Sequence, residues 1–149
     1  MREKLEIISK VYLSLFWSSL TNIDPLGLAP VAVNLFDIIP YDTNIRGSGF
    51  EKHHGLMDIW ASNNITNYSS KLAPTVVLTS GQHNATKSVF MKWKYEMFGD
   101  TRARVDWTTV TPNQMQDLTE RMFDAAEVPQ HVRREYYRAL HANIYRCPL

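Results

Sequence analysis

Three histidines are the residues of this sequence best suited to chemistry: the adjacent pair His53 and His54, and His83 about thirty residues later. A neutral imidazole binds zinc and other borderline divalent cations, and it is the natural general base near neutral pH. Hydrolysis of a phosphodiester needs a water to lose a proton, the phosphate to gain charge stabilisation and the leaving oxygen to be neutralised. A divalent metal can do the last two. The three histidines therefore predict a phosphodiester-cutting site with one divalent ion and one base.

The adjacent pair ends a short segment, residues 50–54, whose pattern predicts a β-strand. Successive side chains of a strand alternate faces, so Glu51 and His53 share one face, whereas Lys52 and His54 share the other. Two neighbours on a strand are poorly placed to bind the same ion. We expect one histidine to bind the metal and the other to face the attacking water.

A second strand and a helix are expected to bring His83 to the same place. Residues 75–79 are rich in β-branched side chains, which predicts a strand. A helix should follow, with Thr79 or Ser80 as its N-cap and Gly99 as its C-cap. His83 lies in its first turn and can complete the metal site from the opposing side.

The remaining chain is expected to be loops and helices. Residues 56–62 predict a short helix within a loop that runs to residue 74. Residues 111–114 form a capping box with proline at the first helical position, and Pro129 begins the last helix. We place a linker over residues 21–47, in which residues 31–39 form a strand or a short helix.

The distribution of charge along the chain says more about possible binding partners than the overall composition does. The chain of 149 residues is one domain, or one domain with an appended segment, and its formal charge of +1 does not diagnose a nucleic-acid binder. Cationic side chains gather between residues 87 and 104, and again between residues 133 and 146. These groups could hold phosphates or could simply be solvated helix faces.

The sequence predicts neither an internal disulfide nor a membrane-spanning helix. Its single cysteine, Cys147, cannot form a disulfide within the chain, and no segment approaches the ~20 apolar residues of a membrane-spanning helix. Residues 1–20 predict an amphipathic helix and no N-terminal signal peptide, because Glu3 and Glu6 occupy the end that should be positive.

Three motifs carry a resemblance to a known family: Glu51-Lys52-His53-His54, the strand over residues 75–79 and the helix opening Gln82-His83-Asn84-Ala85-Thr86-Lys87. Together they are similar to the HNH and endonuclease VII type of nuclease, the ββα-metal nucleases. More narrowly, residues 49–145 resemble toxin domains at the C-termini of bacterial polymorphic toxins. The resemblance implies an α+β fold: a small ββα-metal core of short strands and a helix, with additional C-terminal helices.

A further clue lies upstream of these motifs. Asp24-Pro25-Leu26-Gly27-Leu28 is similar to the sequence that ends the core of Rhs proteins, after which a variable toxin begins. Residues 1–20 do not resemble that core. We therefore expect residues 1–46 to be an N-terminal segment with an Rhs-junction-like linker, and residues 47–149 to be the HNH-like nuclease toxin domain.

The resemblance implies a role for each motif residue. His53 becomes a metal ligand, His54 the general base that activates water, and His83 the second metal ligand. Lys87 stands one turn after His83, where many relatives have another histidine ligand. It would instead meet the scissile phosphate, with Asn84 or water in the coordination sphere.

Neighbouring residues receive supporting roles from the same resemblance. Glu51 orients a ligand or a cationic side chain, and Arg46 contacts phosphate. Asn64 is the candidate for the middle asparagine that steadies the base, with Asn63 and Asn67 as rivals.

The resemblance implies a metal-dependent endonuclease that acts on DNA as an interbacterial toxin. It would be delivered from the producing bacterium into the target-cell cytoplasm, with a cognate immunity protein in the producer. The cofactor would be one divalent ion, with Mg, Zn and Ni left open. Two alternatives remain: a toxin that cleaves RNA, and a non-enzymatic nucleic-acid or protein binding module with structural histidines. We expect His131 and His141, on the last helix, to be structural in either case.

Overall fold

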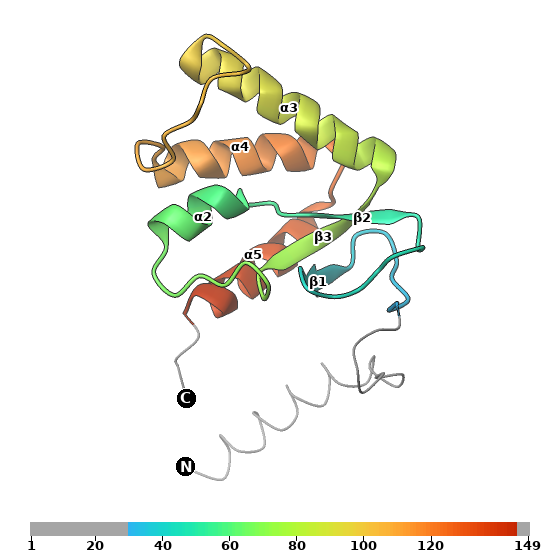
Figure 1. The fold of residues 1–149 in the computed structure, drawn as a ribbon. Coiled ribbons are helices and arrows are strands. Elements are labelled where there is room, and N and C mark those ends of the chain that lie inside the picture. Colours follow the sequence, from blue (N-terminus) through green and yellow to red (C-terminus); the bar gives the residue numbers. More distant parts are fainter. Residues whose placement is uncertain (1–29, 146–149) are drawn as a thin grey trace, which may run out of the picture.

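The computed structural model describes residues 30–145 of the chain. In order, the elements are β1 (Ile38–Pro40), β2 (Phe50–His53), α2 (Asp58–Asn64), β3 (Pro74–Thr79), α3 (Ser80–Phe98), α4 (Pro112–Ala125) and α5 (Gln130–Ile144). The fold is α+β, with β2, β3 and α3 as a ββα unit and further helices around it (Figure 1). The fold class predicted from the sequence is therefore confirmed. The expected helix over residues 1–20, the junction motif of residues 24–28 and Cys147 lie outside the described residues.

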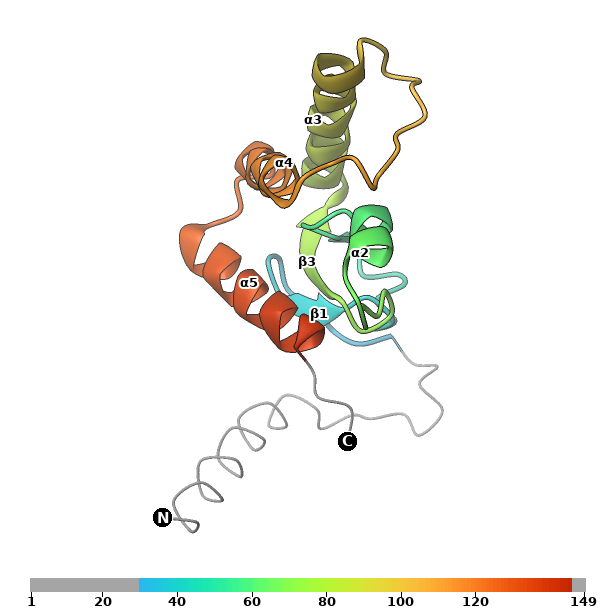
Figure 2. The same ribbon diagram turned by 90° about the vertical axis from the view of Figure 1, so that its left-hand side faces the viewer.

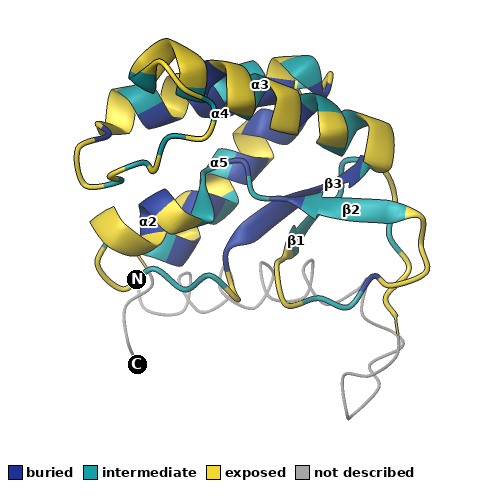
Figure 3. Ribbon diagram, turned by 45° about the horizontal axis from the view of Figure 1, so that its top comes forward, coloured by how far each residue is buried: buried dark blue, intermediate teal, exposed yellow. Residues whose placement is uncertain are grey.

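β3 is the central strand of a three-stranded antiparallel sheet with the order β1-β3-β2. Its residues 74–78 are buried, whereas β1 and β2 are mostly half-buried edge strands (Figure 3). β1 falls within the segment expected to be a linker, and its Ile38 pairs with Val76. Part of that segment thus belongs to the sheet, while the domain boundary at residue 46 stays a prediction.

Two capping boxes start the long helices where the sequence predicts them. Thr79 accepts a hydrogen bond from the backbone of Gln82 at the start of α3, and Thr111 does the same with Gln114 at the start of α4. Gly99 ends α3 in the left-handed conformation, with φ 73°. Local side-chain hydrogen bonds therefore determine where α3 begins.

The helices form two apolar clusters, one of which includes the sheet. α5 packs on one side of β3, and α2 lies on the other side (Figure 2). In the first cluster Val76 and Leu78 contact apolar residues of α4 and α5, among them Phe123 and Tyr136. In the second, Trp60 of α2 packs with residues of α3 and α4. Among residues 30–145 no helix is long and apolar enough to cross a membrane.

Gly55 connects the histidine pair to this packing. A Cβ at Gly55 would lie 2.4 Å from the ring of Phe123 and 2.8 Å from the ring of Tyr136, so no larger residue fits without movement. The next backbone amide, of Leu56, donates to the Tyr136 hydroxyl at 2.7 Å. The chain directly after His54 is therefore held against the core by close approach and by a hydrogen bond.

Candidate functional site

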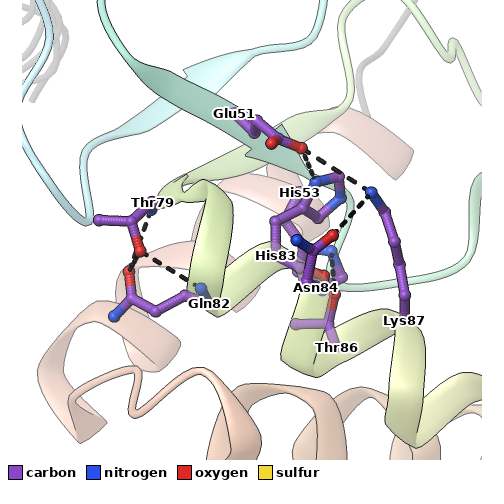
Figure 4. Close-up of polar contacts among 8 residues, drawn as sticks. All are labelled: Glu51, His53, Thr79, Gln82, His83, Asn84, Thr86 and Lys87. Carbon is purple, nitrogen blue, oxygen red and sulfur yellow. Dashed lines mark hydrogen bonds and ion pairs between the residues drawn. The ribbon is translucent and has the colours of Figure 1, made fainter.

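The candidate site lies where the end of β2 meets the first turns of α3 (Figure 4). Glu51 pairs with Leu78 and His53 with Val76 across the antiparallel ladder, so all four side chains lie on one face of the sheet. Gln82 donates from its side chain to the Ala126 carbonyl at 2.9 Å, which fastens the start of α3 to the end of α4. Two separate elements thus present Glu51, His53 and His83 to one another.

The rings of His53 and His83 meet edge to face, with their centroids 5.6 Å apart. Burial, and then the positive charges that His83 and His54 would carry, lower the pKa of His53 to about 3. His53 is therefore a neutral imidazole at physiological pH. This is the state that binds a metal.

Hydrogen bonds determine which nitrogen of His53 carries the proton. The Thr86 hydroxyl donates to the His83 carbonyl at 2.8 Å and lies 3.5 Å from His53 Nδ1. Because the only hydroxyl proton of Thr86 is used, its oxygen accepts from Nδ1–H of His53. The other nitrogen, Nε2, then carries a lone pair. It is buried and has no partner within the described residues.

His83 is held in the same tautomer by Glu51. Its Nδ1 donates to the Glu51 carboxylate, and Lys87 Nζ lies 3.9 Å from the same carboxylate. The hydrogen bond from His83 is the main cause that lowers the pKa of Glu51, with smaller contributions from Ser80 and Lys87. Glu51 stays ionised and fixes the proton on Nδ1 of His83, so Nε2 is the lone-pair nitrogen in the neutral form of that ring.

His54 lies on the other side of the strand end. Its ring tilts against the ring of Tyr41 at 4.5 Å between centroids, and Lys52 Nζ lies 4.7 Å above the same Tyr41 ring. Lys52 also donates to the carbonyls of Tyr41 and Thr43. Burial lowers the pKa of His54, an effect that Asp58 partly opposes, so this half-buried ring is neutral and able to accept a proton.

Of the remaining predicted residues, Asn84 and Arg46 lie at the site and Asn64 lies outside it. The exposed Asn84 accepts from Lys87 Nζ at 3.4 Å, in the first turns of α3. Arg46 lines a cavity that also borders Glu51 and His83. Asn64 is at the end of α2, where its amide donates to the carbonyls of Trp60 and Trp107 at 2.9 Å and 3.0 Å. No contact between Asn64 and His54 is present in the described part of the chain, and the steadying role of Asn64 stays a prediction.

The site suits a metal with two protein ligands better than a closed protein cage. Within residues 30–145 no three His, Cys, Asp or Glu side chains come together as a complete metal site. His53 and His83 nevertheless both offer Nε2 lone pairs, and one of these atoms is buried without a partner. Catalytic metal sites keep positions open for water and substrate, so this pair of donors fits that class.

Two residues at the site have no role in the sequence-based prediction. Tyr41 covers His54, and Lys52 ties the segment that carries Tyr41 to β2. Strand alternation places Lys52 on the His54 face, but nothing in the sequence indicates Tyr41. Its contact depends on how residues 41–43 fold back on the sheet.

The model of one protein family matches most of this chain. It describes an HNH/Endo VII superfamily toxin with a SHH signature, Tox-SHH, and it matches residues 47–145. That range includes β2, β3 and all four described helices. No solved structure matches the chain.

Proposed function

Since this chain belongs to the Tox-SHH family of HNH/Endo VII superfamily toxins, we propose that it is a metal-dependent endonuclease that hydrolyses the phosphodiester bonds of DNA. The observation that carries the proposal is the meeting of His53 and His83, from β2 and α3, at 5.6 Å between ring centroids. His53 is neutral with its proton on Nδ1, and in the neutral form of His83 the hydrogen bond to Glu51 leaves Nε2 as the lone-pair nitrogen. The family supports nuclease chemistry in general, and this pair supports the metal.

The name of the family signature supports the same residues. Read in one-letter code, SHH is Ser-His-His, and His53 and His54 are the only adjacent histidines in the 149 residues. Lys52, the residue before the pair, donates to the carbonyls of Tyr41 and Thr43.

His53 and His83 would hold one divalent ion, which would stabilise charge on the scissile phosphate and on the leaving oxygen. Glu51 holds the His83 ring by accepting from Nδ1, a hydrogen bond that typically raises the basicity of a ligand histidine. Imidazole donors suit zinc or nickel, and open coordination positions also admit magnesium. The choice among these ions is one for experiment.

His54 is the proposed general base that takes a proton from the attacking water. Burial keeps it neutral, and Tyr41 limits the orientation of its ring. Lys87, Asn84 and Arg46 are exposed around the Glu51–His83 pair and would contact the phosphates of the substrate. Backbone contacts of this kind bind DNA without reading its sequence.

In its biological setting, we propose an Rhs-type effector delivered from one bacterium into the cytoplasm of another. A toxin of this activity endangers its producer, so a cognate immunity protein would block it there. The positive side chains Lys87 and Arg46 beside the site favour an immunity protein with an acidic surface.

The decisive experiment incubates the purified chain with plasmid DNA, circular single-stranded DNA and RNA, each with chelator and after addition of Mg, Zn or Ni. We expect cleavage of DNA that chelator abolishes and one of the ions restores. His83→Ala should lose cleavage, whereas His131→Ala, which removes an exposed histidine of α5, should retain it. Cleavage of RNA alone would assign the RNA toxin, and binding without any cleavage would assign the binding module.

A further inference from the structure

A cavity of about 600 Å³ opens beside the Glu51–His83 pair, and residues 42–45 and Phe50 of its wall have no part in the proposed hydrolysis. The wall consists of residues 41–47 together with Phe50, Glu51, Lys52 and His83. A volume of this size lies within the ~300–1,000 Å³ range of pockets that receive small molecules. Because Glu51 and His83 line it, a group in the cavity would be a direct neighbour of a phosphate at the histidines.

The segment that forms the wall is tied to the protein core and to the sheet. Ile45 is buried, with 7% of its surface exposed, and Lys52 donates to the carbonyls of Tyr41 and Thr43. Gly47 and Gly49 both adopt φ +80°, which lets the segment turn back into β2. These contacts preform the cavity in the absence of substrate.

The charges in the wall argue against a phosphate cradle. Arg46 and Lys52 are positive, whereas Asp42 and Glu51 are negative. Lys52 is already committed to carbonyl oxygens and Glu51 to His83. Arg46 is the exception, because no described carboxylate forms an ion pair with its exposed guanidinium.

The aromatic part of the wall has one ring available for stacking. Tyr41 is already in contact with the ring of His54 and with Lys52 Nζ. Phe50 lines the cavity and has no ring partner within residues 30–145. An aromatic face in a preformed cavity with nearly balanced charge suits a nucleobase and its sugar. Aromatic residues serve this purpose widely in proteins that bind single-stranded nucleic acids.

We propose that this cavity receives one nucleoside of the substrate, directly next to the scissile phosphate, with its base stacked on Phe50 and an adjacent phosphate at Arg46. The proposal rests on the proposed function and names the substrate class that the same site prefers. A nucleoside can enter such a cavity only after it leaves the base stack of a duplex. The chain should therefore cut single-stranded or locally unpaired DNA better than intact duplex.

Three small esters that release the same leaving group test the cavity without any need to know the cut site. Methyl p-nitrophenyl phosphate has neither a nucleoside nor a second aromatic ring that could stack, whereas the p-nitrophenyl phosphate esters of thymidine carry a nucleoside on the 5′ or the 3′ side. We expect one thymidine ester to exceed the methyl ester in kcat/KM by about 5- to 150-fold, the range of one base stacked on an aromatic side chain. Equal kcat/KM values for all three esters would overturn the proposal.

Variants of the stacking residue sharpen this test. Phe50→Leu keeps the apolar contact but removes the aromatic face, so the preference for the thymidine ester should be lost. Phe50→Tyr should restore the preference. Tyr95→Leu, an exposed aromatic residue of α3 with 62% of its surface exposed, is the matched control and should behave as the parent. A preference that survives in Phe50→Leu contradicts the proposal.

Binding separates failure of the cavity from failure of the proposed function. If neither DNA nor any ester is hydrolysed with any metal, the proposed function fails. Calorimetric titration of the metal-free chain with thymidine 5′-monophosphate then tests the cavity by itself, with inorganic phosphate as reference. Tighter binding of the nucleotide in the parent than in Phe50→Leu supports the cavity, and equal binding of nucleotide and phosphate overturns it.

Discussion

Two polar clusters of this protein differ in whether their hydrogen bonds are complete. In the α4–α5 cluster, formed by Glu120, Asp124, Arg133 and Tyr137, the guanidinium of Arg133 bonds Glu120 at 2.8 Å, Asp124 at 2.7 Å and the Val128 carbonyl at 2.9 Å. The β2–α3 cluster, formed by Glu51, His53, His83 and Lys87, has the buried Nε2 of His53 without a partner in the described residues.

This difference distinguishes a cluster that stabilises the fold from a cluster that is suited to binding a ligand. A buried polar group usually has a partner, so an unpaired one calls for an explanation. The complete set around Arg133 joins the end of α4 to α5 and needs no ligand. The incomplete set at His53 leaves a lone pair beside a second imidazole, an arrangement suited to binding a cation. Disruption of the first cluster should reduce stability, and disruption of the second should reduce activity.

The largest effect is expected from His54→Ala, which removes the proposed base beside the β2–α3 cluster. Cleavage of DNA should fall ~10²–10⁴-fold, the usual contribution of a general base. The unfolding midpoint should change little, because His54 is half-buried and its ring contacts the exposed ring of Tyr41. Rates and thermal unfolding measured on the same preparation test this. If the variant cuts DNA as fast as the parent, His54 is not the general base.

The next effect concerns the α4–α5 cluster. Arg133→Met keeps an apolar side chain but removes all three hydrogen bonds of the guanidinium and its contact over the Phe123 ring. Hydrogen bonds to charged groups contribute about 1.5–3 kcal/mol, and exposure of Glu120 and Asp124 reduces their share, so we expect a loss of about 1–3 kcal/mol in unfolding free energy. Urea unfolding measures it, with the exposed Arg134→Met as control. Cleavage per folded molecule should equal that of the parent. A large drop would show that the α4–α5 cluster also contributes to activity.

A third prediction concerns pH and His53 in the presence of chelator. In the unfolded chain a histidine titrates near pH 6.5, whereas burial keeps His53 neutral down to about pH 3. Below pH 6.5 the unfolded state therefore binds more protons. The stability present above pH 6.5 is then lost as the pH falls toward 3, by up to about 1.4 kcal/mol for each pH unit.

Urea unfolding at pH 6.5, 5.5 and 4.5 tests this dependence, with His53→Gln as the comparison that removes the titrating group. The slope of stability against pH should be smaller in the variant. Equal slopes would show that His53 is protonated in the folded protein and is poorly suited to bind a metal.

The smallest effect is expected from Lys87→Gln. Lys87 is exposed beside Glu51, where it would neutralise one phosphate charge. The slope of log KM against log salt concentration should fall by roughly 0.7–0.9, the value for one phosphate contact. Arg138→Gln, in the cationic group of α5, should leave the slope unchanged. A smaller slope in Arg138→Gln, with no change in Lys87→Gln, would indicate that DNA contacts α5 and not α3.

Much of the framework could be predicted because it depends on local chemistry. The capping residues Thr79 and Thr111 and the terminal Gly99 act within a few residues of the helix ends that they determine. Strand alternation separates Glu51 and His53 from Lys52 and His54 for the same reason.

Contacts between distant segments could not be predicted in this way. β1 pairs with β3 across more than thirty residues, and Tyr41 meets His54 only because residues 41–43 fold back on β2. Asn64 was selected by its type and position, yet in α2 its amide bonds backbone carbonyls. The cavity at Phe50 likewise needs a surface that several segments build together.

The sequence by itself determined which residues can do chemistry and which elements carry them, because imidazole chemistry, strand alternation and helix capping act over a few residues. Tertiary structure alone decided that His53 is buried with one nitrogen unpaired, that Glu51 orients His83, and that a cavity adjoins them. The reason is physical: desolvation and ring orientation depend on packing between segments that are far apart in the chain. Residue type and spacing do not report that packing.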